Sequence, residues 1–334
     1  MGRVFYDEDA NLESLRGLTV SVFDYGSMGR AQALNLRDSG VKVLVCELAD
    51  SAEAGLALAE GFEVVAPAEA ARRGDVLGML VADLEQERLF RQTIEPELRP
   101  GQMLLFFHGF ALHYGLVHPP DTVDVAVISP KGPGELLRRM FVRGQGVPCL
   151  VAVAHDTTGR AWERAVAYGK AIGATRAGLF ETSVREETET DLFGEQAVLC
   201  GGTTELVHAG FETLVNAGYA PEVAYFELLH QLKLVVDLMY EHGISGMRER
   251  VSATALYGDL TRGPRVVDAG VRERLQGLLE EIQDGRFARE WMAEDAAGRP
   301  RFQRLLEEGR HHPIETVGRR LRAMMPWFPK GEGG

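Results

Sequence analysis

The fold is decided by the stretch LTVSVFDYGSMG, residues 18–29, in which a short apolar run leads directly into a glycine-rich turn. The first part of the stretch, residues 18–23, is of strand type. A helical stretch follows at residues 30–39, and a second strand-like run at residues 41–46 ends at Glu47. Strand, glycine turn, helix, strand and terminal acid, in this order, make the first βαβ unit of a dinucleotide-binding fold.

The glycine turn departs at one position from the usual G-x-G-x-x-G pattern. Asp24 stands in the first glycine slot, while Gly26 and Gly29 keep the other two. Asp tolerates a positive φ better than most residues, so the turn can form. Its carboxylate would face the phosphates of a dinucleotide, and weaken binding, unless the side chain turns away to cap a local N–H group. The candidate cofactor-binding residues of the turn are Asp24, Tyr25, Gly26, Ser27, Met28 and Gly29.

Glu47 indicates which nucleotide is bound. It lies about 20 residues beyond the glycines, where an acid accepts hydrogen bonds from the ribose hydroxyls of NAD and repels a 2′-phosphate. The following loop, residues 48–53, contains the further candidate Ser51 but no Arg or Lys. We therefore predict that NADH is preferred over NADPH. The alternative is an ordinary surface acid after a strand.

Further strand-like runs alternate with helix-length stretches as far as residue 182. The runs are residues 62–65, 75–81, 103–107, 123–128 and 149–153, and a helix is expected at residues 159–172. This alternation predicts an α/β Rossmann-type, doubly wound parallel sheet, whose ligands bind beyond the carboxyl ends of the strands. We place the dinucleotide-binding domain at residues 1–182.

Polar side chains follow three of these strands. Asp83 and Gln86 come after one strand, His108 after another, and Lys131 and Gly134 after a third. A lone His or Lys in a loop is usually only solvated. At the ligand-binding edge, beside Gly and Pro residues that fix the backbone, these side chains are candidates for a functional site. We assign Asp83, Gln86 and Gly134 to cofactor binding. We assign His108 and Lys131 to catalysis.

A second informative stretch, EETETDLFGEQAVLC at residues 186–200, combines acids with an apolar end. If Thr188 or Thr190 caps a helix here, Asp191 and Glu195 lie four residues apart on one face. Such carboxylates repel each other unless a cation or a proton lies between them, and Mg²⁺ takes oxygen ligands. The alternative is a solvated acidic helix start, stabilised by the helix dipole. The small apolar residues that follow favour a buried helix, in which carboxylates need partners.

A second pair with the same spacing lies on a strongly apolar stretch, residues 224–240. Glu227 and Gln231 share one face of the expected helix. The two stretches together predict a carboxylate-lined metal cage. Most of the circumference of this helix is apolar, which predicts burial in a core or an interface.

Beyond residue 182 the chain changes to helical periodicity. Helices are expected at residues 203–217, 220–243, 266–283, 287–294, 299–309 and 312–325. We place an all-helical domain at residues 183–328 and a disordered tail at residues 329–334.

Composition narrows the possible partners and the compartment. The chain of 334 residues has a net charge of −13 and no basic stripe, which argues against nucleic acid and anionic membranes as partners. No apolar run reaches the ~18 residues of a membrane-spanning helix, and no signal-peptide core is present, so we expect a cytoplasmic protein. Cys46, Cys149 and Cys200 have no CxxC spacing and are expected to be small buried hydrophobes.

Several longer motifs go beyond these local patterns. They are ALNLRDSG at residues 33–40, PKGPG at 130–134, residues 186–202, residues 232–241 and LRAMMPW at 321–327. With these motifs the chain resembles ketol-acid reductoisomerase of the short bacterial class I, over nearly its whole length.

The resemblance implies a Rossmann domain joined to a knotted all-helical domain, with active sites completed across an intertwined homodimer or a higher oligomer. The implied reaction is a Mg²⁺-dependent alkyl migration in 2-acetolactate or 2-aceto-2-hydroxybutyrate, followed by hydride transfer from a nicotinamide. Two metals would hold the oxygens of the substrate. The implied roles are Asp191 as a bridge between the metals, Glu195 as a ligand of one, Glu227 as a ligand from the partner subunit, Ser252 as a contact of the substrate carboxylate, and His108 and Lys131 as lining residues.

Some residues depart from the family pattern at functional positions. Gln231 replaces a second Glu, which would weaken the second metal site and the migration step, because an amide cannot act as a base. Asp24 replaces a glycine. The other departures are Met28 for Gln, Arg30 for His, Leu48 for Arg, Ala253 for Asn or Asp, and Leu256 for Glu.

These departures leave three hypotheses. The first is a working ketol-acid reductoisomerase that prefers NADH. The second is a related reductase that has lost the migration and reduces another 2-oxo acid or an imine. The third is a non-catalytic homologue kept as a binding or structural partner. The retained acids, Lys131 and Ser252 favour an enzyme, because a buried acid cluster is costly to keep.

Overall fold

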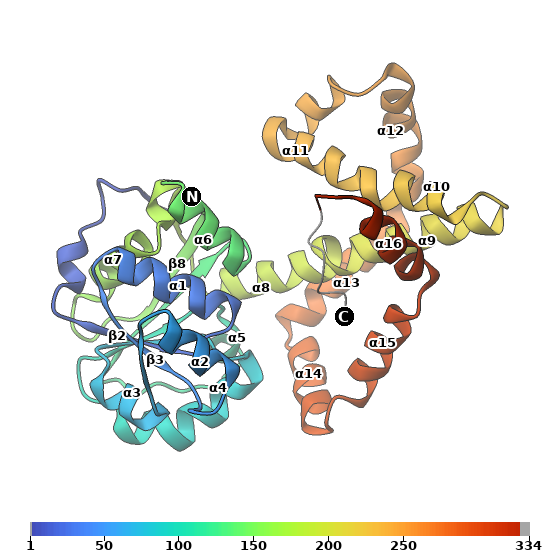
Figure 1. Ribbon diagram of the computed structural model, residues 1–334. Coiled ribbons are helices and arrows are strands. Elements are labelled where there is room, and N and C mark those ends of the chain that lie inside the picture. The colour runs from blue at the N-terminus through green and yellow to red at the C-terminus, as the bar shows by residue number, and fades with distance from the viewer. Residues whose placement is uncertain (1, 328–334) are drawn as a thin grey trace. The chain divides into compact units, whose positions relative to one another are not determined.

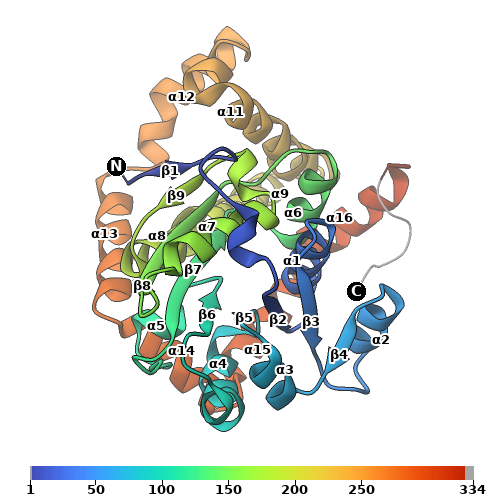
Figure 2. The same cartoon turned by 90° about the vertical axis from the view of Figure 1, so that its left-hand side faces the viewer.

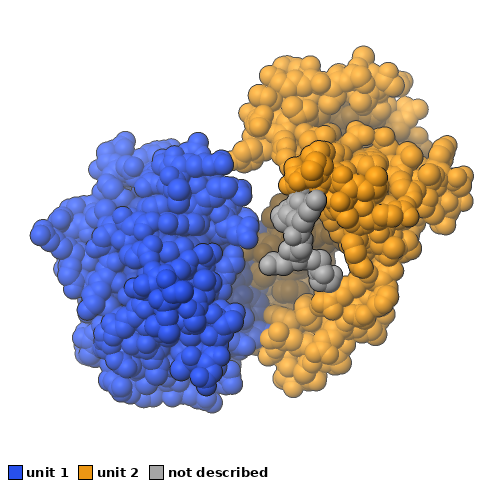
Figure 3. Space-filling model, in the orientation of Figure 1, with its two compact units in different colours: residues 1–190 blue, residues 191–334 orange. Residues whose placement is uncertain are grey.

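The computed structural model describes residues 2–327. The chain divides into two compact units, residues 1–190 and residues 191–334, which Figure 3 shows in different colours. The first unit is organised around a β-sheet, and the second consists of helices in its described part. The tail expected at residues 329–334 lies outside the described residues.

Unit 1 contains a nine-stranded sheet in the order β1-β9-β8-β7-β6-β5-β2-β3-β4 (Figure 2). The strands are β1 Val4–Phe5, β2 Thr19–Phe23, β3 Lys42–Cys46, β4 Glu63–Val65, β5 Val76–Met79, β6 Met103–Phe106, β7 Asp124–Pro130, β8 Cys149–His155 and β9 Leu179–Glu181. β2 has a parallel neighbour on each side, β3 and β5. The order of the strands therefore reverses at β2, and doubly wound sheets bind their ligands at the carboxyl end of such a strand.

The sheet is mixed, which corrects the expectation of a parallel sheet. β7 and β8 pair antiparallel, and so do β1 and β9. The path of the chain after β7 explains why β8 runs antiparallel to β7. Helix α6, Gly134–Val142, packs beside α1, Ser27–Asp38, through Leu137. The chain therefore enters β8 from the carboxyl edge of the sheet, and β8 runs in the opposite direction.

Helices cover both faces of the sheet, so the central strands are buried throughout (Figure 2). The other helices of unit 1 are α2 Ala52–Ala59, α3 Pro67–Arg73, α4 Asp83–Leu89, α5 Phe110–His113 and α7 Ala161–Ala171, with short segments η1 Leu12–Leu15, η2 Phe90–Ile94, η3 Glu95–Glu97 and η4 Ala174–Arg176. β2 contributes side chains to the hydrophobic cores on both faces of the sheet. Val20 and Val22 pack in one core and Phe23 packs in the other. This double burial fixes the loops that follow the carboxyl ends of the strands.

Unit 2 is built from helices within residues 191–327 (Figure 1). They are η5 Glu195–Leu199, α9 Gly201–Asn216, α10 Pro221–Tyr225, η6 Phe226–His230, α11 Gln231–Arg248, α12 Ala253–Val266, α13 Ala269–Gln283, α14 Arg286–Ala296, α15 Pro300–Arg310 and α16 Pro313–Met324. The sequence pattern did not predict α12, which contains the poor helix formers Gly258, Gly263 and Pro264. Within residues 2–327, no helix has both the length and the apolar composition that crossing a bilayer requires.

Unit 2 has a small core and a large exposed apolar surface. The buried cluster comprises Val207, Phe211, Ala224, Tyr225, Ile314 and Leu321. Side chains of α11 are open to solvent in the single chain, among them Leu234 at 50% and Tyr240 at 87% exposure. Burial of this helix in a core was therefore a wrong expectation, whereas burial in an interface stays a prediction.

The three cysteines differ in their surroundings. Cys46 and Cys149 are buried, as expected, and Cys200 is exposed, contrary to expectation. Burial raises the pKa of the Cys46 thiol to about 12, so this thiol stays protonated and unreactive at neutral pH.

Candidate active site

The acidic stretch forms α8, Val184–Gly194 (Figure 1). Ser183 Oγ accepts a hydrogen bond from the N–H of Glu186 at 3.1 Å, so Ser183 caps the helix. Thr188 and Thr190 lie inside it, where their hydroxyls donate to carbonyl oxygens one turn earlier. The expectation that Thr188 or Thr190 caps the helix is therefore wrong, and the helix begins about one turn sooner.

Glu187 is the important side chain that the sequence pattern missed. Because of the earlier helix start, it stands one turn before Asp191 and two turns before Glu195. Its side chain is fully buried. Glu187 Oε2 accepts a hydrogen bond from the N–H of Gly109 at 2.8 Å, and its Oε1 lies 3.3 Å from Lys131 Nζ.

The Lys131–Glu187 ion pair joins α8 to the loops that follow β6 and β7. Lys131 Nζ also donates to Ser129 Oγ at 2.9 Å. A buried carboxylate is costly unless it is both paired and hydrogen-bonded, and Glu187 meets both conditions. The same packing requires a glycine at position 109, because a Cβ on Gly109 would lie 2.1 Å from Thr188 Oγ1.

His108 lies beside this ion pair. Its Nδ1 is 3.3 Å from Asp83 Oδ2, and a histidine that donates from Nδ1 to a carboxylate presents Nε2 as its basic nitrogen. His108, Glu187 and Asp191 each offer one ligand atom, and these atoms lie within 4.8 Å of one another. Asp191 lies on the same helix as Glu187, one turn later.

The donor set on this face of α8 fits a divalent cation that is bound by carboxylates. Asp191 is half-buried and Glu195, one turn later, is exposed. Mg²⁺ usually binds through one or two carboxylates and keeps several waters, which this partly open pair permits. Glu187 is already engaged by Lys131 and by a main-chain N–H, so it is better suited to position its neighbours than to bind a metal.

Two π-helical segments carry candidate metal ligands. Glu195 is the first residue of η5, and Glu227 lies within η6. π-helical turns are rare in proteins as a whole, but many of them occur at functional sites. Their presence here supports both assignments. η5 also corrects an expectation, because its Val198 and Leu199 are exposed and the end of the acidic stretch is not a buried helix in the single chain.

The remaining candidates for catalysis, Glu227, Gln231 and Ser252, lie in unit 2. Gln231 Nε2 donates to Glu227 Oε2 at 2.8 Å, and both side chains are exposed. Ser252 is also exposed and caps α12, because its Oγ accepts a hydrogen bond from the N–H of Ala255 at 3.2 Å. An exposed amide–carboxylate pair is weakly held.

The glycine turn lies at the carboxyl end of β2. Asp24 has a φ of 91°, the left-handed value that usually requires glycine. Its Oδ2 accepts a hydrogen bond from the N–H of Gly26 at 3.0 Å, so the side chain does cap a local N–H group. Gly29 in the turn and Gly134 at the start of α6 must be glycines, because main-chain atoms lie too close to them to leave room for a Cβ. A Cβ on Gly29 would lie 2.0 Å from the carbonyl oxygen of Asp24, and one on Gly134 would lie 2.3 Å from that of Ser27.

The turn fits the phosphates of a dinucleotide except at Asp24. Helix α1 begins at Ser27 with no side-chain cap, and helix N-termini bind phosphate through their N–H groups and dipole. Glu47 stands beside the turn, because its Oε1 accepts a hydrogen bond from the N–H of Tyr25 at 2.6 Å. Burial raises the pKa of the Asp24 carboxyl, and although the Gly26 N–H opposes this effect, the charge of Glu47 adds to it.

The other cofactor candidates surround the turn in unit 1. Ser51 caps α2, and Met28 packs in the small cluster between α1 and α6. Gln86 is buried and donates to a main-chain carbonyl at 3.0 Å. Arg30 is bound to Glu60 at 2.5 Å, so its charge is neutralised.

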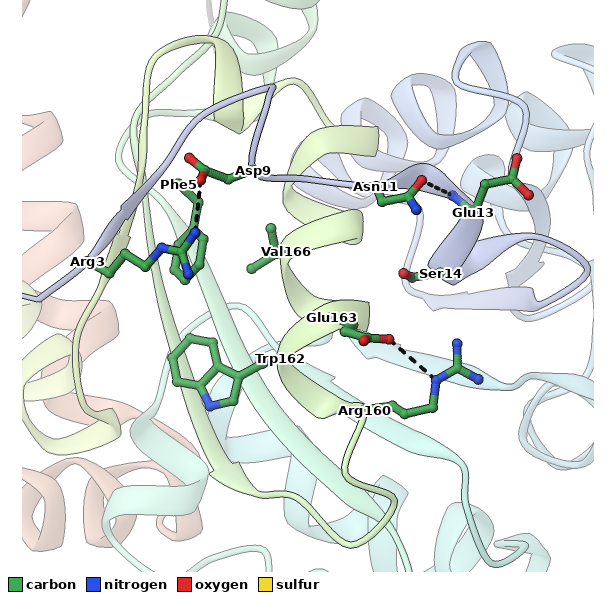
Figure 4. Close-up of a pocket in the computed structure, with 10 residues that line it drawn as sticks. All are labelled: Arg3, Phe5, Asp9, Asn11, Glu13, Ser14, Arg160, Trp162, Glu163 and Val166. Atoms are coloured by element: carbon green, nitrogen blue, oxygen red, sulfur yellow. Dashed lines mark hydrogen bonds and ion pairs between the residues drawn. The ribbon is translucent and has the colours of Figure 1, made fainter.

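A cavity elsewhere in unit 1 does not have the character of an active site. It has a volume of about 560 Å³ and is drawn in Figure 4. The lining residues are Arg3, Phe5, Asp9, Asn11, Glu13, Ser14, Arg160, Trp162, Glu163 and Val166. Arg3 pairs with Asp9 at 2.9 Å and Arg160 with Glu163 at 3.5 Å, so these charges are neutralised within the wall (Figure 4). Near α8, in contrast, ligand atoms of His108, Glu187 and Asp191 lie within 4.8 Å of one another.

Comparison with known families identifies the chain. Residues 14–178 match the domain described as acetohydroxy acid isomeroreductase, NADPH-binding domain, and residues 184–327 match ketol-acid reductoisomerase, C-terminal domain. The chain belongs to the ketol-acid reductoisomerase family. The resemblance drawn from its sequence motifs is thereby confirmed.

Individual relatives give the same result. The ketol-acid reductoisomerase (NADP(+)) of Saccharopolyspora erythraea is 54% identical over 324 residues, which are 97% of this chain and 98% of that protein. The solved structure of an NADH-preferring ketol-acid reductoisomerase from an uncultured archean is 40% identical, has a TM-score of 0.94, and is matched over 97% of this chain and 99% of that chain. A semialdehyde dehydrogenase NAD-binding protein from Cupriavidus necator, at 20% identity, a TM-score of 0.62 and coverage of 80% and 99%, shares the fold alone.

This ketol-acid reductoisomerase is therefore an oxidoreductase with an N-terminal nucleotide-binding domain. The hypotheses of a reductase without migration and of a non-catalytic homologue are not favoured, because the identity extends over nearly the whole chain. The roles of individual residues stay predictions.

Proposed function

We propose that this ketol-acid reductoisomerase converts 2-acetolactate or 2-aceto-2-hydroxybutyrate into the 2,3-dihydroxy acid, with Mg²⁺ and with NADH as its preferred reductant. The observation that carries the proposal is the face of α8, where the ion pair of Lys131 with the buried Glu187 lies next to Asp191 and His108. Bound Mg²⁺ would polarise the ketone and hydroxyl oxygens of the substrate and stabilise the negative charge that develops on them.

The side chains of this face have distinct proposed roles. Asp191 and Glu195 are the metal ligands. Lys131, fixed by its buried partner, supplies a positive charge for the substrate's oxygens. Asp83 orients His108, so that the imidazole Nε2 can exchange a proton with a substrate oxygen. Because these groups come from one helix and separate loops of a rigid sheet, the site is pre-organised for one orientation of the substrate.

The charges near the glycine turn support NADH as the preferred nucleotide. Glu47 follows β3 and would accept hydrogen bonds from ribose hydroxyls but repel a 2′-phosphate. Leu48, where the family resemblance gives an Arg, is 73% exposed and uncharged. The names of the relatives differ on this point, since the archean enzyme is called NADH-preferring and the enzyme of Saccharopolyspora erythraea carries NADP(+) in its name.

We further propose a homodimer with shared active sites, in the cytoplasm. Glu227, Gln231 and Ser252 are exposed in the single chain, and α11, which begins at Gln231, also exposes Val236 and Tyr240. A large exposed apolar surface on one unit is typical of an interface between identical chains. A knotted topology of the helical domain belongs to the same proposal.

NADH oxidation by the purified protein with Mg²⁺ tests the proposed reaction. 2-Acetolactate is compared with the already migrated 3-hydroxy-3-methyl-2-oxobutanoate, and each assay is repeated with NADPH. We expect turnover of both substrates and faster turnover with NADH. Turnover of the migrated compound alone would contradict the migration step, and turnover of neither would contradict the proposal as a whole.

A further inference from the structure

The Asp24 carboxylate is bonded to a main-chain N–H group of the glycine turn. Phosphates bind at such turns through main-chain N–H groups at the start of the following helix. Here the N–H of Gly26, which directly precedes α1, already donates to Asp24 Oδ2 at 3.0 Å. The neighbouring N–H, that of Tyr25, donates to Glu47 Oε1 at 2.6 Å. Carboxylates therefore hold two consecutive N–H groups of the turn.

The main chain keeps Asp24 in this place. Its φ of 91° is a left-handed value, and its N–H donates to the carbonyl oxygen of Cys46 at 3.2 Å. Gly29 packs so closely on the carbonyl of Asp24 that a Cβ there would lie 2.0 Å from the oxygen. The Asp24 side chain can rotate, but its Cα cannot leave the turn without unfolding it.

Acids face Asp24 from three neighbouring elements. Glu47 lies at the end of β3, Glu53 on α2 and Glu85 on α4, and their charges act on the Asp24 carboxyl. The cation that follows the turn, Arg30, is bound to Glu60. A diphosphate placed here would therefore meet an ionised Asp24 with little compensating positive charge.

We propose that Asp24 makes nucleotide binding proton-dependent: the diphosphate binds to the protein in which Asp24 is protonated, and the Asp24 carboxyl then donates its hydrogen to a phosphate oxygen. The proton comes from solvent and adds to the carboxylate, so no other bond is formed or broken. The inference rests on the proposed nucleotide-binding function.

The coupling between protonation of Asp24 and nucleotide binding gives the direction in which the NADH affinity changes with pH. Burial already raises the pKa of Asp24 in the free protein, and the charge of the diphosphate raises it again in the complex. The affinity for NADH then rises as the pH falls, by up to about tenfold per pH unit between the pKa values of the complex and of the free protein. Below both values the affinity is constant.

Direct binding of NADH to the full chain tests this proposal without recourse to turnover. The dissociation constant is measured by fluorescence from about pH 6 to about pH 8.5, and calorimetry in buffers of different ionisation enthalpy gives the number of protons taken up. Asp24→Asn and Asp24→Gly both tolerate the left-handed φ and cannot ionise. Glu53→Gln is the matched control, because it removes a nearby charge and leaves Asp24 in place.

We expect the wild type and Glu53→Gln to take up protons and to bind NADH more weakly as the pH rises. Both Asp24 variants should bind more tightly than the wild type at high pH, with no proton uptake. The Asp24 proposal alone is overturned if NADH binds to the wild type without proton uptake, or if Asp24→Asn keeps the pH dependence. If NADH binds to none of the four proteins, the proposed nucleotide function fails as well.

Discussion

The two clusters of candidate site residues are held in different ways. In unit 1, Glu187 is fully buried and bonded to Lys131 and to the N–H of Gly109. In unit 2, Glu227 and Gln231 are exposed and bonded to each other. Folding of one chain is enough to order the first cluster. The second stands among exposed apolar side chains, and for this reason we propose that a second chain completes it.

The largest effect is expected from Asp191→Asn. Loss of a metal-binding carboxylate removes several kcal/mol of transition-state stabilisation, which corresponds to a decrease in turnover on the order of a thousandfold. Steady-state rates of NADH oxidation across a Mg²⁺ titration measure this loss. The control is Glu186→Gln on the same helix, because Glu186 accepts from Thr182 Oγ1 at 2.6 Å and its side chain is exposed. An equal loss in both variants would contradict the assignment of Asp191.

Lys131→Met tests the ion pair of the buried Glu187 in unit 1. Without Lys131 the buried Glu187 lacks its cation, which costs about 3 kcal/mol of unfolding free energy, at the low end of the range because the Lys131 side chain is 31% exposed. Urea denaturation measures the change. The counterpart in unit 2 is Lys233→Met, which breaks the exposed pair with Asp237 and should cost less than about 1 kcal/mol. Similar losses in the two variants would remove the contrast between the clusters.

Gln231→Glu tests the weaker cluster directly. The new carboxylate faces Glu227 one turn away, so the metal-free helix is slightly destabilised while Mg²⁺ gains an anionic ligand. We expect the Mg²⁺ concentration for half-maximal turnover to fall about tenfold, for a gain of about 1.4 kcal/mol in binding. Unchanged Mg²⁺ dependence and an unchanged migration rate would show that Gln231 does not face the metal.

The smallest effects are expected at two serine caps, one in each unit. Ser183→Ala and Ser252→Ala each remove a hydrogen bond to a helix N-terminus and should cost about 1 kcal/mol of stability. Only Ser252→Ala should also raise the KM for 2-acetolactate, because Ser252 is proposed to contact the substrate carboxylate. A raised KM in both variants would mean that the effect comes from helix order alone.

The sequence predicted the strands of the central sheet better than their directions. Apolar runs located β2 to β8 close to their observed bounds, because buried strands need continuous apolar residues. β1 and β9 were missed: β1 has only two residues, too few to show a pattern, and β9 has three and ends at the charged Glu181. The direction of β8 follows from how α6 packs beside α1, which composition does not record.

The grouping of the candidate site residues was predicted in part. The sequence named His108, Lys131 and Asp191, which the structure places around Glu187, because strand ends and helical spacing bring polar side chains together in known ways. Glu187 was missed because the start of α8 was placed too late. The residues from Ser183 to Glu186 carry the Ser-x-x-Glu pattern of a capping box, a signal that gives the correct start. Exposure of α11 could not be foreseen, since the apolar periodicity is the same for a core and for an interface.

Complementation between two inactive variants tests most directly whether the clusters of different chains form one site. Asp191→Asn disables the α8 cluster and Glu227→Gln the cluster of unit 2, and the two chains are produced together with different affinity tags. In a dimer with shared sites, each mixed dimer has one site with both defects and one intact site. Random pairing then restores about a quarter of wild-type turnover. Mixed dimers that are isolated through both tags and remain inactive would contradict the account.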